Sequence, residues 1–126
     1  MNASSKKKLS QYERLAGMLR DRIAAGIYAR GDKLPSEMEL MDESGLSRST
    51  VRHALKVLVD EGLVRTERTA GRYVTEDRAL IEQLRAEAAR NLTAEFLEKM
   101  RGIGYGPEQA AALLERWNEK EGTNHD

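Results

Sequence analysis

Two helix-start signals about ten residues apart, with a glycine just before the second, constrain this chain more than any other feature of its sequence. Ser36 can cap the helix that follows it, and Glu39 lies at the position from which a carboxylate reaches back to the capping residue. Gly45 then favours a left-handed stop, and Ser47 can cap a further helix that begins at Arg48. Two short helices joined by so few residues are typical of a helix-turn-helix.

The segments on either side of this pair complete a small domain. A helix over residues 11–25 is predicted by apolar residues at helical spacing, namely Tyr12, Leu15, Ala16, Leu19 and Ile23. Residues 63–66 and 72–75 are rich in strand-forming types and flank a stretch that contains Gly71, which predicts a β-hairpin. Three helices and a hairpin make a winged helix-turn-helix, which we place at residues 11–76. The predicted fold class is therefore mainly α.

The helix that begins at Arg48 has two distinct faces at about 100° per residue. One face is apolar and carries Val51, Ala54, Leu55 and Leu58; the other is basic and rich in hydrogen-bond donors, and carries Ser49, Arg52, His53 and Lys56. Arg48 and Arg52 lie one turn apart, so both can reach into a major groove, where a guanidinium pairs with guanine. We predict that Arg52 reads a base. The alternative, that these arginines are solvated or pair with Glu39 or Glu43, stays open.

Other residues are expected to contact the DNA backbone. The helix N-termini at Ser36 and Ser47 offer backbone amides to phosphate oxygens. In the hairpin, at least one of three arginines is expected to follow the phosphates or enter the minor groove, with ordinary surface charge as the alternative: Arg65, Arg68 and Arg72. His53 and Lys56 are expected on the phosphate side. Residues 1–10, which include Lys6, Lys7 and Lys8, are predicted to be a flexible basic tail.

Composition excludes most catalytic chemistry. The chain has no cysteine and only two histidines, which lie far apart, so we expect no disulfide, no metal site and no cofactor. No nucleophile with a base and no phosphate-binding glycine loop is recognisable, so we do not expect an enzyme. Apolar runs are too short to cross a bilayer, which predicts a cytoplasmic protein without a membrane partner. The 21 basic and 21 acidic side chains cancel, yet positive charge concentrates in residues 44–75.

Residues 77–121 predict a long helix and a shorter one that opens at Pro107. Apolar residues recur along both, at Ile81, Leu84, Ala88, Leu92 and Phe96 and then at Leu114 and Trp117. Two helices have few residues of their own against which to bury such stripes, so we predict that the region forms a homodimer. The alternative, that both helices fold back on the first domain as core, stays open. Residues 122–126 are expected to be a tail.

Three runs at these spacings resemble the N-terminal domain of GntR-family bacterial transcription regulators: LPSEMEL at residues 34–40, GLSRSTVRHAL at 45–55 and LVDEGLV at 58–64. The short helical C-terminal part, with FLEKM at 96–100 and GYGP at 104–107, is similar to the YtrA-like subfamily. The resemblance implies a dimeric repressor or regulator on an inverted-repeat operator, with no effector specified. It also implies DNA contacts at Ser36, Arg48, Ser49, Arg52, Arg68, Thr69 and Gly71. This chain departs from the family pattern at Arg30, Met38 and Thr69.

A second function class remains open at this point. Winged helices also serve as protein-interaction modules without sequence-specific DNA binding, and a net charge of zero suits that role. It predicts that the basic helix face is dispensable and that binding to duplex DNA is weak at every salt concentration.

Overall fold

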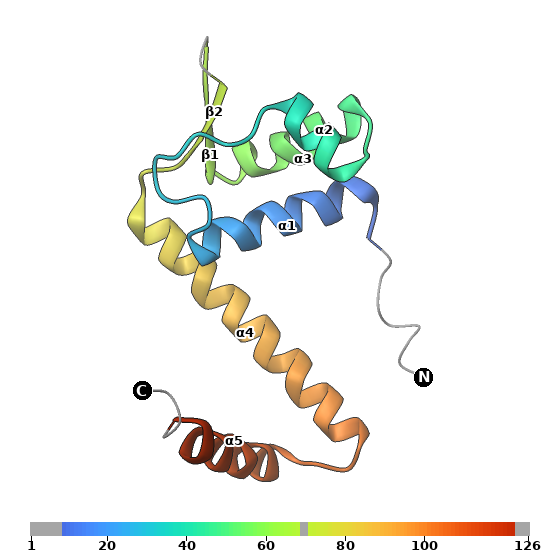
Figure 1. The fold of residues 1–126 in the computed structure, drawn as a ribbon, viewed down its shortest axis with the longest axis vertical. Helices are drawn as coiled ribbons and strands as arrows, with labels where there is room; N and C mark the ends of the chain where they lie inside the picture. The colour runs from blue at the N-terminus through green and yellow to red at the C-terminus, as the bar shows by residue number, and fades with distance from the viewer. Residues whose placement is uncertain (1–8, 69–70, 123–126) are drawn as a thin grey trace. The chain divides into compact units, whose positions relative to one another are not determined.

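The computed structural model describes residues 9–68 and 71–122, which form five helices and one hairpin (Figure 1). The elements are, in order, α1 (Gln11–Ala25), α2 (Glu37–Ser44), α3 (Arg48–Asp60), β1 (Val64–Glu67), β2 (Gly71–Val74), α4 (Arg78–Gly102) and α5 (Pro107–Gly122). The chain divides into two compact units between residues 86 and 87. The predicted fold class, mainly α with a winged helix-turn-helix, is confirmed.

The caps predicted at the start of α2 and α3 and at the end of α2 are present. Ser36 accepts a hydrogen bond from the backbone amide of Glu39, whose carboxylate in turn accepts from the Ser36 amide, so the capping box is complete. Ser47 accepts from the amide of Thr50 at the start of α3. Gly45 ends α2 in the left-handed conformation, with φ 75°.

The hairpin is held on one side by a segment that the sequence presents only as a link. β1 and β2 pair antiparallel, each one residue nearer the hairpin tip than predicted. Lys33 bridges to Tyr73 of β2, and the Leu34 amide donates to the carbonyl of Arg72 at 2.8 Å. This third stretch of extended backbone attaches the wing to the segment that leads into α2.

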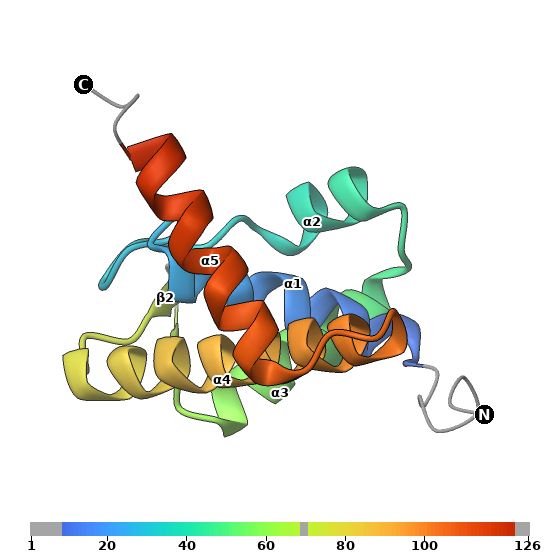
Figure 2. The ribbon, with the colours of Figure 1, turned by 90° about the horizontal axis from the view of Figure 1, so that it is seen from below.

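The core of the first unit forms where α1, α2 and the hairpin pack around α3 (Figures 1 and 2). Its largest fully buried side chains are Leu19, Ile23, Leu40, Leu55, Leu58, Val51 and Val74. The apolar face predicted for α3 is confirmed, because all four of its residues are 0% exposed. The opposite face of α3 is therefore directed to solvent.

The first turns of α4 belong to this core, which corrects two expectations. Ile81 is 8% exposed and lies within the core cluster, and Leu84 packs against it half-buried. Arg85 Nε donates to the carbonyl oxygen of Ala24 at the end of α1, at 2.9 Å. Assigning Ile81 to a dimerisation stripe is therefore wrong, because one chain already buries it. The division between the two units also falls inside α4 and not after residue 76.

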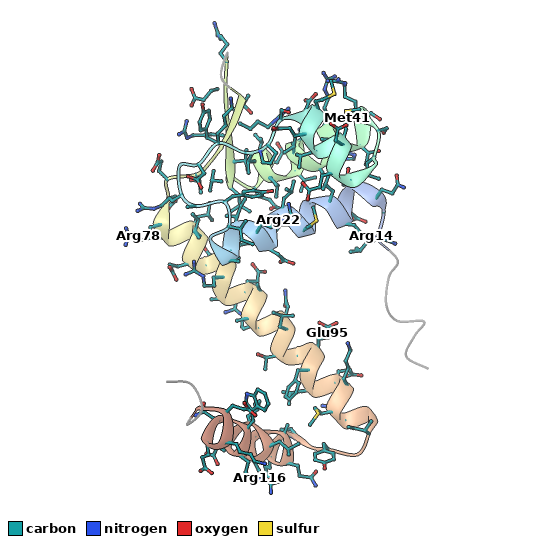
Figure 3. The ribbon with its side chains drawn as sticks, viewed as in Figure 1. Arg14, Arg22, Met41, Arg78, Glu95 and Arg116 are labelled. Atoms are coloured by element: carbon teal, nitrogen blue, oxygen red, sulfur yellow. The ribbon has the colours of Figure 1, made fainter. Side chains whose placement is uncertain are left out.

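The described part of the second unit buries little by itself. Among its described hydrophobic residues only Ala110 is buried, whereas a set of large apolar side chains is exposed: Leu92, Phe96, Ile103, Tyr105, Leu113, Leu114 and Trp117. The side chains of α5, with Arg116 labelled, project from several sides of the helix (Figure 3). No helix in the described ranges has the combination of length and apolarity that crossing a bilayer requires.

The predicted ends of the last two helices need small adjustments. Gly102 is the last residue of α4, and the break follows in a turn where Gly104 has φ 91°. Pro107 opens α5 as predicted, and α5 extends through Gly122, the first residue of the expected tail. Lys6, Lys7 and Lys8 and residues 123–126 lie outside the described residues.

We expect Gly45→Ala to lower the free energy of unfolding by about 1–2 kcal/mol, the cost of a left-handed backbone with a Cβ. A Cβ at Gly45 would meet no atom within 4 Å, so the effect isolates the backbone. Gly17→Ala in α1 is the control, because its Cβ also meets open space and its φ is not positive. It should stabilise by about 0.5–1 kcal/mol. Urea unfolding of both variants checks this, and equal shifts would contradict it.

Candidate nucleic-acid interface

The solvent face of α3 presents basic side chains along its length. The side chains of Arg48, Arg52 and Lys56 are 46%, 61% and 70% exposed. Lys56 pairs with Asp60 one turn on at 3.0 Å, so part of its charge is balanced locally. The basic solvent face expected for α3 is therefore present, and its two arginines lie toward the N-terminal end of the helix.

Three arginines from two elements meet at one carboxylate. Glu37, the first residue of α2, accepts from Arg48 Nη1 at 3.0 Å and from Arg52 Nε at 3.1 Å to each oxygen. Arg72 Nη2 of β2 completes the cluster at 3.2 Å. The structure thus joins the start of α3 to the wing through Glu37, a residue that the sequence analysis did not single out.

The expected alternative partners of these arginines are engaged elsewhere. Glu43 accepts from Arg22 of α1 at 2.8 Å, and Arg22 also donates to the Tyr28 hydroxyl at 2.8 Å (Figure 3 labels Arg22). These two hydrogen bonds raise the pKa of Arg22 above its ordinary value. Glu39 accepts from the Ser36 amide in the capping box. The alternative in which Arg48 and Arg52 pair with Glu39 or Glu43 is therefore not what the structure has: both arginines pair with Glu37 instead.

The Glu37 carboxyl is a charged group in a sheltered position, 16% exposed. Burial raises its pKa, but hydrogen bonds from Arg52 and Arg72, with their positive charge, outweigh burial and lower the pKa below its ordinary value. The carboxylate is therefore held ionised, and the three guanidiniums around it leave a net positive cluster.

We expect Glu37 to make folding pH-dependent in acid. Because its pKa is lower in the folded chain, its contribution to stability is present above its unfolded pKa and is lost as pH falls through its folded pKa. Glu37→Gln should therefore be less stable than the parent near neutral pH, with the difference closing below about pH 4. Urea unfolding across this range measures it; a difference that does not change with pH would contradict the assignment.

A second set of predicted residues gathers at the N-terminal ends of α1 and α3. The rings of His53 and Tyr12 stack with centroids 3.6 Å apart and planes at 12°. They line an open hollow of about 370 Å³ together with Ser10, Gln11, Ser49 and Thr50. Tyr12 is a site residue that sequence reasoning placed only in the apolar stripe. Its one signal was a polar hydroxyl at the very start of that stripe.

The wing positions the remaining basic residues differently from one another. Arg72 is turned inward to Glu37, whereas Arg65 lies over the Tyr73 ring at 5.1 Å and pairs with Glu67. Arg68 is exposed and has no ion pair among the described residues. Thr69, an expected contact, lies outside the described residues. Gly71 has φ 95°, as the end of a tight turn requires.

Lys33 is a further candidate that the sequence analysis missed. It is exposed, and no ion pair involves it in the part of the chain that the structure describes. A Cβ at Gly71 would lie 3.2 Å from Lys33 Cε, so the lysine stem runs beside the first residue of β2, at the tip end of the wing. Nothing local marks this lysine, because only strand pairing brings it beside the hairpin.

The interface therefore has a positive centre and polar flanks. Arg48, Arg52 and Arg72 come together on Glu37, while Ser49 and His53 lie with Tyr12. Ser47 serves as a helix cap, and its hydroxyl also donates to Thr50 Oγ1 at 2.9 Å. Within the described ranges, no group of three or more histidine or acidic side chains is placed to hold a metal ion.

The comparisons with known proteins agree with this geometry. Residues 11–74 match the family model described as "Bacterial regulatory proteins, gntR family". The Exu regulon transcriptional regulator of Escherichia coli is 36% identical over 107 residues, which are 82% of this chain and 37% of that protein. The chain thus spans little more than a third of the length of that relative.

Two solved structures are similar as well. A GntR family transcriptional regulator from Listeria monocytogenes is 30% identical with a TM-score of 0.76, over 88% of this chain and 97% of that one. The AraR DNA-binding domain in complex with an operator is 31% identical with a TM-score of 0.53, over 56% of this chain and 84% of that one. Because the family model covers half of the sequence and these relatives share its fold, this chain belongs to the GntR family of bacterial regulatory proteins.

Proposed function

We propose that the protein is a transcriptional regulator that binds duplex DNA with sequence preference through α3 and the wing. The observation that carries this proposal is the convergence of Arg48, Arg52 and Arg72 at the solvent face of the first unit. The family consists of regulators and not of enzymes, and the related AraR domain was solved with an operator.

In this proposal each part of the interface has a separate role. Arg48 and Arg52 enter the major groove, where Arg52 pairs with guanine O6 and N7. Arg68 and Lys33 neutralise phosphates near the tip end of the wing, which adds affinity without sequence preference. The backbone amides at the start of α2 and α3 receive phosphate oxygens beside the caps Ser36 and Ser47. The adjacent DNA backbone is contacted by the remaining predicted residues, Ser49, His53, Lys56, Thr69 and Gly71.

We further propose that the second unit joins two copies of the chain. Its exposed apolar side chains, with Leu92 at 65% and Trp117 at 63%, leave this unit without a core of its own. Apolar surface gathered in one region of a chain marks an interaction site. A second copy of the same helices supplies a matching surface under two-fold symmetry, and each wing can then occupy one half of an inverted repeat.

The finer assignment to the YtrA-like subfamily rests on the short helical C-terminal region. The similar Listeria monocytogenes regulator is matched over 97% of its length by this chain, including a part beyond the winged helix. A dimer seated on an operator blocks access of other proteins to the same grooves, so we propose repression as its mode of action.

Selection of bound duplexes from a random pool tests the proposed function with the full chain. The expected product is an inverted repeat whose half-site centres lie about 10 base pairs, one helical turn, apart. Binding should weaken steeply as salt is raised. If no sequence is enriched and duplex binding is weak even at low salt, the protein-interaction reading replaces this proposal.

A further inference from the structure

Glu37 occupies an unusual place for an acid, at the centre of a surface that should attract DNA. It is the first residue of α2, where the positive end of the helix dipole favours a carboxylate. Its two oxygens receive four hydrogen bonds from three guanidiniums, at 3.0 to 3.2 Å. No other carboxylate among the described residues has ion pairs with more than two basic side chains.

The cluster leaves most of the arginine donors available. Arg52 uses Nε toward Glu37, and neither of its terminal nitrogens has a partner among the described residues. Arg48 donates to Glu37 through Nη1 only, and Arg72 donates through Nη2 only. Each guanidinium is therefore held along one edge, while its other edge stays open to an acceptor. A planar group held in this way loses little conformational freedom when it pairs with a base.

The same carboxylate also carries negative charge into the interface. Binding to DNA of arbitrary sequence depends almost entirely on neutralising phosphates. Glu37 lowers that attraction, because it engages three positive charges and repels the incoming backbone. Well-matched base contacts can outweigh this cost, whereas an unmatched duplex cannot. Discrimination by a repulsive element of this kind is a general route to specificity.

We propose that Glu37 is a specificity-determining positioning residue, which orients Arg48 and Arg52 for base reading, holds Arg72 of the wing on the same carboxylate and opposes binding to unmatched DNA. The inference rests on the proposed DNA-binding function and adds a role for a residue that need not touch the DNA. A purely structural role, in which Glu37 only fastens α2 to α3 and the wing, makes different predictions.

Anisotropy titrations of the full chain against two duplexes separate these roles. One duplex has mixed sequence, and the other is the sequence that the parent protein selects from a random pool. Glu37→Gln should bind the mixed duplex several-fold to about tenfold tighter, with a salt slope steeper by about 0.9, equivalent to one more phosphate. It should gain nothing on the selected duplex, so the affinity ratio should fall about tenfold.

Two further variants sharpen the comparison. Glu39→Gln removes the same charge two residues along α2. Among the described residues this carboxylate accepts a hydrogen bond only from the Ser36 amide in the capping box, and glutamine also caps. It should leave slope and ratio near those of the parent. Glu37→Asp keeps the charge but shortens the reach, so mixed-sequence binding should stay near the parent while binding to the selected duplex weakens. Circular dichroism melts confirm that each variant is folded.

The outcomes distinguish this inference from the proposed function. If the parent binds neither duplex, the proposed function fails. If the parent discriminates and Glu37→Gln matches it, or weakens on both duplexes alike, only the inference about Glu37 is overturned. Equal changes of slope in Glu37→Gln and Glu39→Gln would also overturn it, because a general loss of negative charge would then explain the effect. If Glu37→Gln does not fold, unchanged discrimination by folded Glu37→Asp overturns the positioning role.

Discussion

Leu92→Arg is expected to convert the proposed dimer to a monomer and to weaken its binding to an inverted repeat by about 10²–10⁴-fold. Leu92 is 65% exposed on α4, so the substitution removes little packing within one chain. In a two-fold dimer the new charges would be desolvated and brought near their symmetry mates. Loss of the second half-site then removes the avidity of the pair. Light scattering and titration of the repeat measure the two effects.

The control for this variant places the same charge on the opposite side of the helix. Ala94 is exposed and lies about 200° around α4 from Leu92, so Ala94→Arg should remain dimeric. Trp117→Arg in α5 gives an independent test of the same surface. Dimers that persist in both Leu92→Arg and Trp117→Arg would show that the second unit is not the interface. Leu84 is unsuitable for this test, because it packs against the core of the first unit.

Arg52→Ala is expected to cost about 1–3 kcal/mol of binding to the selected duplex and to relax the preference at one base pair. The Arg52 side chain is 61% exposed. When Arg52 is replaced, Glu37 still forms ion pairs with Arg48 and Arg72, so the fold should persist. Lysine at this position restores the positive charge but not the two parallel N–H donors of a guanidinium. Arg52→Lys should therefore recover the attraction to DNA phosphates without the base preference.

Lys56→Ala is the matched control on the same helix face. Lys56 pairs with Asp60 and is 70% exposed, so its loss should weaken binding to all duplexes alike by a smaller amount. Titration of each variant against the selected duplex and single-base mismatches gives the comparison. Equal and sequence-independent losses in Arg52→Ala and Lys56→Ala would reject base reading by Arg52.

The helix boundaries of the first unit were predictable because their causes are local. Ser36 and Ser47 satisfy free amides within three residues, and Gly45 supplies the left-handed stop at the helix end. The apolar face of α3 followed from helical periodicity, and its burial left the basic face to solvent. The hairpin strands lie one residue nearer the tip than predicted, with the same pairing register, because strand ends depend on which residues complete ladder hydrogen bonds and not on residue type alone.

The candidate site was only partly predictable. The arginines were recognised from their spacing on α3. Their alternative partners were expected to be Glu39 and Glu43, which are nearer to Arg48 in the sequence than Glu37 is. Glu37 and Arg72 lie 35 residues apart, and they meet only because β2 packs beside the start of α2. Lys33 was missed for the same reason, since no sequence period connects it to the wing.

By itself, the sequence determined where the helices start and stop, which face of α3 is apolar and that the chain belongs to a winged-helix family. Each of these depends on hydrogen bonds and spacing within a few residues. The tertiary structure alone decided that Glu37 gathers three arginines and that Ile81 is core rather than interface. Such pairings join segments distant in the chain, and the packing of whole elements selects them, because local pattern carries no information on which surfaces will meet.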